Sequence, residues 1–587
     1  MKKYILYITL LVGVSTFFLA GCKKAMDLDP NNNLSDADYW QTPDQFKLAA
    51  NEFYTYLITF NQVLYDLNNG GPHSDIRSDF HLQTSFNPVS SGTNSTLATD
   101  ANWNTAFTRL RAINYLLDKS ASYPAQADIA GYVAEAKFFR AYVYFDLLQQ
   151  YGGVPIVTKP LSIESGELQA PRNSRDEVVD FIIKDLEEAI PVLPLESSIP
   201  AANKGRISRG AANAFLGRVG LYEGTWQKFR SGNSSRYNLL FDKSIASSRS
   251  VMQDASYEIF APSILGDSAQ KYMFILENEK SNPAGLGKSA NKEYILANRY
   301  DFSLRQIGQN VTHTYIGAGV TRKLANLYLC QDGLPVSKSP LFKGYSTTRS
   351  EFVNRDNRMR YNMMIDSNYH WDNENPGSRI NWLNDAADRA NSRGRHDPRV
   401  GAGYASQKWG AERRLNDTQE AYDYPVIRLA EVYLNYAEAV FERNGAITDA
   451  DLDLSLNKVR NRVNKTMPKL SVGFAAANGL DMRNEIRRER GIELYLEGFR
   501  LDDLKRWKTA ETEMPMNTTG VRWRGTLWER RWHLGTATNP YTPPLALDVE
   551  GNLIWESGRQ WAERNYLYPI PTQQIQLNSQ LTQNPGW

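Results

Sequence analysis

Two polar segments of the chain combine residue types that can bind a ligand rich in hydroxyl groups. Aromatic side chains can cover the apolar face of a sugar ring, while amide, carboxylate and guanidinium groups pair with its hydroxyls. The candidate ligand-binding residues are Asn69, His73, Asp75 and Arg77 in the first segment and Trp371, Asp372, Trp382 and Trp409 in the second. Two alternatives stay open, because the first segment is also typical of a surface turn and each tryptophan can instead anchor the core.

A third segment, residues 522–532, interleaves tryptophan with arginine. Trp523, Trp528 and Trp532 are five and four residues apart, a spacing that can place them on one face of a helix. Such a pattern can bind an acidic glycan or single-stranded nucleic acid. Packing of this segment against the rest of the protein or against a partner is the interpretation that we favour.

Catalytic chemistry has little support in the sequence. Glu489, Glu493 and Glu497 are four residues apart, so we expect them to share one face of a helix. Their arginine neighbours would keep them ionised rather than raise a pKa for acid catalysis. No nucleophile elbow, phosphate loop or dinucleotide-binding motif stands out. We therefore expect a protein that is not an enzyme and has no cofactor.

Metal and disulfide chemistry are equally unsupported. The six histidines lack the HExxH spacing of a zinc site, and Cys22 and Cys330 are the only cysteines. We expect no metal centre, although the sequence leaves open a structural cation such as calcium.

The first 22 residues have the pattern of a lipoprotein precursor. Lys2 and Lys3 precede an apolar run that ends at Leu19-Ala20-Gly21-Cys22. The run is too short to span a membrane comfortably, which disfavours an uncleaved transmembrane helix. The pattern resembles the lipobox of bacterial lipoproteins, whose cysteine carries lipid. We predict a signal peptide at residues 1–21, lipidation of Cys22 and a polar tether at residues 22–34.

The composition is that of a large globular protein with balanced charges. The chain has 587 residues, with 67 Lys and Arg against 65 Asp and Glu, and cleavage of the signal peptide would remove Lys2 and Lys3. The mature chain would then carry no net charge. This argues against nucleic acid as a partner, because nucleic-acid binding depends on a basic surface that neutralises phosphates.

Helical patterns flank the polar segments and must position them. Apolar residues recur at helical spacing in residues 103–123, 138–148, 174–192, 208–226 and 241–252. In the fourth stretch Gly217 and Gly220 would let a neighbouring helix approach closely. Helices taken two at a time are similar to tetratricopeptide hairpins, although no strict repeat period is present.

The helical pattern fades between residues 256 and 425 and returns after them. Extended loops with short strands are expected in this stretch, and such loops often carry binding groups on a rigid scaffold. Helices are expected again at residues 429–440 and 452–463, and residues 484–507 form a dense charged block that predicts an ion-paired scaffold. The predicted fold class is mostly α: an irregular tetratricopeptide-like helical-hairpin scaffold with a large loop-rich ligand-binding region and short strands.

Several separated stretches resemble the SusD/RagB family of Bacteroidetes outer-membrane lipoproteins, which bind nutrients at the cell surface. The matching stretches are residues 135–142 with 151–155, 205–222, 424–439, 487–507 and 568–571 with 583–587. On this resemblance, residues 35–587 form one SusD-like unit. Its parts are an amino-terminal helical part (35–255), a loop-rich ligand region (256–425) and a carboxy-terminal helical part (426–587).

The resemblance also implies a function. It implies a non-catalytic glycan-binding lipoprotein, anchored by lipid in the outer membrane and facing the cell exterior. Such a protein delivers an oligosaccharide to a partner SusC-like TonB-dependent transporter for nutrient import. A peptide-capturing family member and a mainly structural lid of the transporter are the alternatives. Residue patterns alone would predict only a surface-anchored helical binding protein.

Overall fold

Helices dominate the structure of this chain. The computed structural model describes residues 39–62, 73–82, 87–308, 311, 319–369, 380, 401–412, 419–531 and 543–587. Within these residues, three two-stranded antiparallel sheets accompany the helices. The prediction of a mostly α fold with short strands is therefore confirmed.

Paired helices form the amino-terminal part. They are α2 (Pro43–Phe53), α3 (Ala101–Ala121), α4 (Gln126–Tyr151), α5 (Arg175–Ala189), α6 (Arg209–Lys228) and α7 (Ser234–Met252). Helix α3 packs on α4, α4 on α5, and α6 on α7. The expected helices are confirmed here, although α7 begins seven residues earlier than residue 241, the start that the apolar pattern indicates.

Local sequence signals fix several of these helix ends. Ser174 accepts a hydrogen bond from the Glu177 amide, and the Glu177 carboxylate accepts one from the Ser174 amide, so that a capping box starts α5. Gly152 ends α4 with φ of 77°, a backbone conformation that favours glycine.

The contact between α6 and α7 depends on small residues, as the sequence predicts. A Cβ atom at Gly220 would lie 2.7 Å from the carbonyl oxygen of Leu240, and one at Gly217 would lie 2.9 Å from Ser248 Oγ. Both positions must therefore stay without a side chain for the two helices to pack this closely.

Short elements separated by loops make up the middle of the chain. They are α8 (Ala269–Phe274), β2 (Tyr294–Asn298), β3 (Gly319–Val320), α10 (Arg322–Leu327), α11 (Asn357–Asn362) and β4 (Tyr424–Arg428), with a further short strand, β1 (His81–Leu82), earlier in the chain. Strand β1 pairs with β3, and β2 pairs with β4. These pairings connect the loop-rich region to segments on both sides of it.

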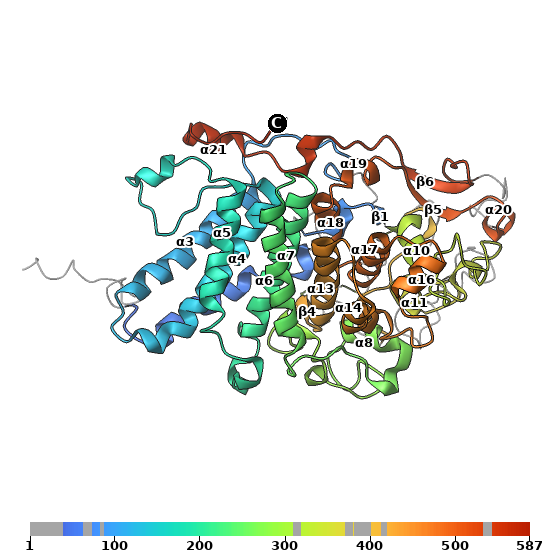
Figure 1. The fold of residues 1–587 in the computed structure, drawn as a ribbon, viewed down its shortest axis with the longest axis horizontal. Coiled ribbons are helices and arrows are strands. Elements are labelled where there is room, and N and C mark those ends of the chain that lie inside the picture. Colours follow the sequence, from blue (N-terminus) through green and yellow to red (C-terminus); the bar gives the residue numbers. More distant parts are fainter. Residues whose placement is uncertain are drawn as a thin grey trace, which may run out of the picture.

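The carboxy-terminal part returns to helices. They are α13 (Leu429–Asn444), α14 (Asp449–Leu454), α15 (Leu456–Arg460), α16 (Val472–Ala477), α17 (Met482–Glu493), α18 (Arg500–Arg506), α19 (Ala510–Glu513), α20 (Leu527–Arg531) and α21 (Thr572–Leu577), and β5 (Thr518–Arg522) pairs with β6 (Asn552–Glu556). In Figure 1 the helices follow one another along the long axis roughly in chain order, from α3 at one end to α13 and α17 past the centre.

Two carboxy-terminal expectations need correction. The single helix expected at residues 452–463 is broken at Ser455, whose φ of −131° and ψ of −95° are not helical, into α14 and α15. The charged block is likewise two helices, because the backbone turns between Glu493 and Arg500 with positive φ at Leu496 and Gly498. Glu497 therefore lies in this turn and not on the helical face of Glu489 and Glu493.

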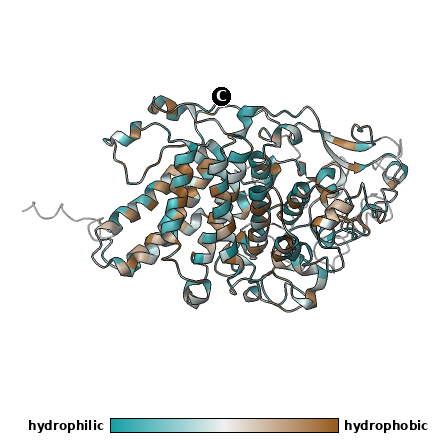
Figure 2. Ribbon diagram, viewed as in Figure 1, coloured by the Kyte–Doolittle hydropathy of each residue, from teal (hydrophilic) through white to brown (hydrophobic). Residues whose placement is uncertain are grey.

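One continuous hydrophobic core contains residues of the amino-terminal, loop-rich and carboxy-terminal parts. Most helices carry both hydrophobic and hydrophilic residues, as amphipathic helices do (Figure 2). Among the described residues, no helix combines the length and the apolar character that crossing a membrane requires. The division of the chain at residues 255 and 425 stays a prediction.

Candidate functional site

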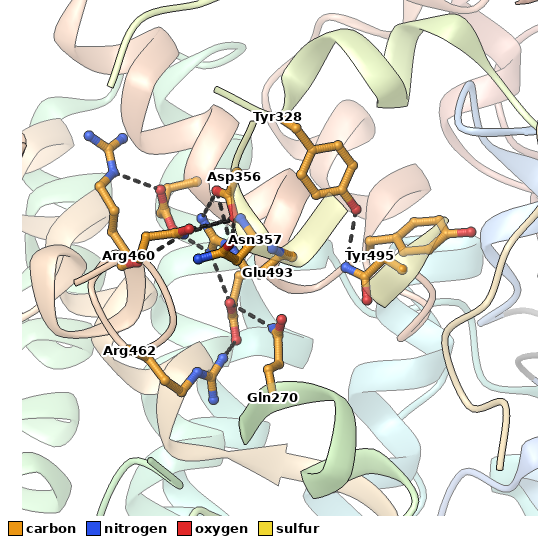
Figure 3. Close-up of polar contacts among 12 residues, drawn as sticks. Gln270, Tyr328, Asp356, Asn357, Arg460, Arg462, Glu493 and Tyr495 are labelled. Atoms are coloured by element: carbon orange, nitrogen blue, oxygen red, sulfur yellow. Dashed lines mark hydrogen bonds and ion pairs between the residues drawn. The ribbon is translucent and has the colours of Figure 1, made fainter. Parts of the chain in front are cut away.

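A buried set of ion pairs joins the loop-rich region to the carboxy-terminal helices. We call it the ion network, and each of its members is at most 4% exposed. The members are Glu293, Asp356, Arg358, Lys408, Arg428, Arg460, Arg462, Glu489, Glu493 and Glu497. Figure 3 shows part of it, in which Arg462 and Gln270 both point toward the Glu493 carboxylate.

Arg428 lies at the centre of the ion network, where β4 meets α13. Its Nε lies 2.7 Å from Glu497 Oε2. Its Nη1 lies 2.7 Å from Glu493 Oε1 and 3.0 Å from Glu293 Oε1. One side chain thus fixes the turn after α17 against the segment that leads into β2. The ion-paired scaffold predicted from the charged block is confirmed.

The electrostatics of the ion network are those of a structural element. Burial alone would raise the pKa of Glu493, but the guanidinium groups of Arg462, Arg428 and Arg358 hold it well below its usual range. The pKa of Glu497 is also lowered, chiefly by Arg428 and Lys408 against the opposing effect of burial. Carboxylates that stay ionised at neutral pH are poor general acids.

Backbone hydrogen bonds bring four short segments, two of which contain the strands β1 and β3, together beside this network. We call this arrangement the loop platform; it comprises residues 80–82, 319–321, 362–368 and 404–407. Amide-to-carbonyl distances are 3.0 Å from Thr321 to Phe80, 3.2 Å from Val320 to Tyr404 and 2.9 Å from Met364 to Ala405. Segments more than 300 residues apart in sequence therefore share one rigid support.

The first predicted ligand segment is partly described, and its described members are buried. His73 is 9% exposed, Asp75 1% and Arg77 2%. His73 Nε2 lies 2.9 Å from Asp146 Oδ1, and the Arg77 guanidinium lies 4.8 Å from the centre of the Tyr568 ring. In this structure these three side chains hold the 73–82 segment against the helices and offer little surface to a ligand.

Asp75 connects the same segment to the turn after α17. Its carboxylate accepts hydrogen bonds from the backbone amides of Arg500, at 3.0 Å, and Gly498, at 3.3 Å. Gly498 has φ of 85°, and a Cβ there would lie 2.2 Å from the carbonyl oxygen of His73. This close approach accounts for glycine in the turn.

Trp409 also belongs to the core in this structure. It is 1% exposed, and its ring packs against Phe60, Phe274, Tyr422 and Tyr424 with ring centres 4.7–6.2 Å apart. No face of the indole is free to stack on a sugar. The alternative of core anchoring is thus correct for this tryptophan, and its assignment as a ligand residue is corrected.

The neighbouring Lys408 was not among the predicted site residues. Its Nζ lies 2.7 Å from Glu497 Oε1 and donates to the Tyr495 carbonyl oxygen at 2.5 Å. Burial lowers the pKa of Lys408 to about 8, against the opposing effect of Glu497. A lysine in a loop gives no sequence signal of burial, so only the structure assigns it to the ion network.

Other predicted residues lie outside the described part of the chain. They are Cys22, Asn69, Trp371, Asp372, Trp382 and Trp532. Trp523 and Trp528 are described and are 0% and 2% exposed, which agrees with packing of the 522–532 segment against the rest of the protein. Within the described ranges, no group of three or more His, Cys, Asp or Glu residues is arranged to hold a metal ion. The structural cation therefore stays a suggestion.

Comparison with protein families gives two matches to this chain. A model described as the SusD family matches residues 275–587, which is more than half of the chain. A second model, described as "Starch-binding associating with outer membrane", matches residues 30–221. The two matches together cover α2 to α5, most of α6, most of the loop-rich region and the carboxy-terminal part, and leave out residues 222–274 with α7.

Individual relatives are similar at low identity. SusD-like protein P38 of Formosa agariphila is 25% identical over 314 residues, which cover 51% of this chain and 55% of that protein. The starch-binding protein SusD of Bacteroides thetaiotaomicron is 31% identical over 165 residues, or 28% of this chain and 22% of that protein. This chain thus spans about half or less of the length of these two relatives.

Solved structures show the same fold. A SusD-like carbohydrate binding protein from Bacteroides fragilis superposes with a TM-score of 0.71 at 22% identity, covering 92% of this chain and 99% of that one. A surface glycan-binding protein from Bacteroides fluxus gives a TM-score of 0.59 at 20% identity, covering 93% and 100%. The tetratricopeptide-like helical scaffold predicted from the sequence is thereby confirmed.

Proposed function

We propose that this chain, which belongs to the SusD family, is a non-catalytic cell-surface lipoprotein that binds oligosaccharides for nutrient import. The observation that carries the proposal is the match of the SusD family model to residues 275–587. Similar proteins named for starch or carbohydrate binding support a glycan as the ligand. The loop platform supports it further, because segments held rigidly to one another by backbone hydrogen bonds suit a binding face.

The sequence of the amino terminus supports a location at the cell surface. We propose that Cys22 carries lipid, that residues 22–34 form the tether and that the protein faces the exterior from the outer membrane. A SusC-like TonB-dependent transporter is the proposed partner, to which the protein passes its ligand. The family model described as associating with the outer membrane supports this location.

The absence of catalysis is also part of the proposal. The carboxylates of the ion network are buried and paired with arginine or lysine, and the pKa values of Glu493 and Glu497 are lowered. Hydrolysis of a glycosidic bond needs one carboxylic acid with a raised pKa beside a second carboxylate and the bound sugar. Glu493 and Glu497 therefore lack the raised pKa, and burial denies a sugar access to the carboxylates of the ion network.

Affinity electrophoresis tests the proposed ligand class. The mature chain should be retarded in gels that contain its polysaccharide and should migrate freely in gels that contain unrelated polymers. A chain that no polysaccharide retards, and that binds peptides instead, would be a peptide-capturing family member. A chain that binds neither class would be a structural lid of the transporter.

A further inference from the structure

A cavity of about 490 Å³ lies between the amino-terminal helices and the loop-rich region, apart from the predicted ligand residues. Its walls come from residues 196–206, which precede α6, from the segment around Tyr257 and from strand β2. The partner strand of β2, β4, lies in the lower half of Figure 1 beside α13. The volume falls within the range of about 300–1,000 Å³ that is usual for ligand pockets.

Aromatic and apolar side chains line part of the cavity, among them Tyr257, Tyr294 and Met273. The Tyr294 hydroxyl donates to the Met273 carbonyl oxygen at 3.2 Å, and the Tyr257 hydroxyl lies 2.9 Å from Ser208 Oγ. These hydrogen bonds fix the rings in place. Tyr257 is only 8% exposed and supports the wall from behind, so the partly exposed ring of Tyr294 is the aromatic surface that suits the apolar face of a pyranose.

The charged residues of the cavity leave an excess of positive charge. Its two carboxylates are already neutralised, because Glu196 lies 3.1 Å from Lys204 Nζ and Asp423 lies 2.5 Å from Lys288 Nζ. Arg206, which also lines the cavity, is paired with a carboxylate behind the wall.

Two further cations of the cavity are exposed and uncompensated. Within the described part of the chain, Lys292 and Arg299 have no carboxylate within ion-pair distance. The Arg299 guanidinium donates to the Lys204 carbonyl oxygen at 2.6 Å, which holds this cation beside the cavity. A carboxylate or sulfate on a ligand would supply the missing negative charge.

We propose that this cavity is a binding site for an acidic oligosaccharide, with a sugar ring against Tyr294 and a uronate carboxylate or sulfate ester at Lys292 and Arg299. The inference rests on the proposed glycan-binding function for its ligand class and adds a site and a charge preference to it. The combination of a partly exposed tyrosine ring and a cationic rim favours an acidic sugar over an acidic peptide.

Calorimetry with matched ligands tests this site. Trigalacturonate, an alginate trimer and a chondroitin sulfate tetrasaccharide serve as acidic probes, and methyl-esterified trigalacturonate serves as the neutral match. We expect at least one acidic probe to bind, and to bind more weakly as salt is raised. Where trigalacturonate is that probe, its methyl ester should bind at least about tenfold more weakly, a difference of about 1.4 kcal/mol.

Charge reversal tests whether the acidic probe binds in the cavity. The double variant Lys292→Glu, Arg299→Glu should lose at least about tenfold in affinity for the acidic probe. Binding of any neutral glycan found by affinity electrophoresis should be unchanged. Lys469→Glu is the control, because Lys469 is exposed, lies outside the cavity and, among the described residues, forms its ion pair with the exposed Asp453. Thermal unfolding of each variant verifies that the fold is intact.

Each contrary result has a distinct meaning. Failure of all three acidic probes to bind overturns the inference, as does binding that the double variant leaves unchanged. If neutral glycans still bind in either case, the proposed function stands. If polyglutamate binds and depends on Lys292 and Arg299 while the acidic sugars do not bind, the ligand class proposed for the cavity is wrong.

Discussion

Glu493 illustrates, at the scale of single residues, how this protein stabilises charge in its interior. Its carboxylate contacts the guanidinium groups of Arg358, Arg428 and Arg462 and has no exposed surface. The attraction among these groups offsets the cost of removing them from water only while every partner is present.

Glu493→Ala should therefore be strongly destabilising. It leaves three buried guanidinium groups short of a partner, and we expect the free energy of unfolding to fall by about 3–5 kcal/mol. Urea denaturation measures the change. The exposed Glu279 is the matched control, whose replacement by alanine should change the same quantity by less than about 0.5 kcal/mol. Equal losses in the two variants would refute a structural role for the ion network.

The buried carboxyl group of Asp75 should make the stability of the protein depend on pH. Burial raises its pKa from 3.8 to about 6, although the amides of Arg500 and Gly498 donate to its carboxylate. The folded state therefore holds the proton on Asp75 more tightly than the unfolded state does. The stabilisation that this proton provides is fully present below pH 3.8 and is lost as the pH rises through about 6.

Asp75→Asn should remove this pH dependence. As the pH rises from about 4 to about 7, the free energy of unfolding of the wild type should fall relative to that of the variant. Urea denaturation at several pH values measures the difference. A difference that stays constant over this range would contradict a raised pKa at Asp75.

At the scale of elements, the contact between α6 and α7 offers a test of close packing. A Cβ at Gly220 would lie 2.7 Å from the Leu240 carbonyl oxygen, whereas one at Gly131 in α4 would meet no atom within 4 Å. Gly220→Ala should lower the melting temperature, because it forces two backbones apart. Gly131→Ala should raise stability by about 0.5–1 kcal/mol, because alanine favours the helical conformation more than glycine does. If both substitutions raised the melting temperature, or both lowered it, the result would contradict this account.

Some helices of this fold can be predicted from the sequence, whereas certain breaks and turns cannot. Periodic apolar residues predict α3 to α6 and α13, because a long helix against a core imposes that spacing. They do not predict the break at Ser455 or the turn that carries Glu497, which depend on contacts made by distant segments. The burial of Trp409 and Asp75 could not be predicted for the same reason, because tryptophan and aspartate occur both in binding loops and in buried supports.

The sequence also provides no indication of Lys292 and Arg299 as site residues, because the carboxylates and tyrosines around them come from separate stretches of the chain.

At the scale of the whole molecule, the predicted lipid and the folded part have separable roles. Both family matches begin after Cys22, at residues 30 and 275. Cys22→Ala should therefore leave the unfolding free energy and the ligand affinity unchanged and abolish display at the cell surface. Protease treatment of intact cells measures the display, and binding by the purified variant provides the control. Loss of binding in solution would contradict this role of the cysteine.

The central claim, capture of an oligosaccharide without cleavage, is tested most directly by isothermal titration calorimetry. The mature chain is titrated with neutral and acidic oligosaccharides, and the sugars are recovered and sized by chromatography. The account predicts saturable binding of at least one oligosaccharide, which is recovered at its original length. Binding of peptides without binding of any oligosaccharide, or recovery of shortened sugars, would contradict it.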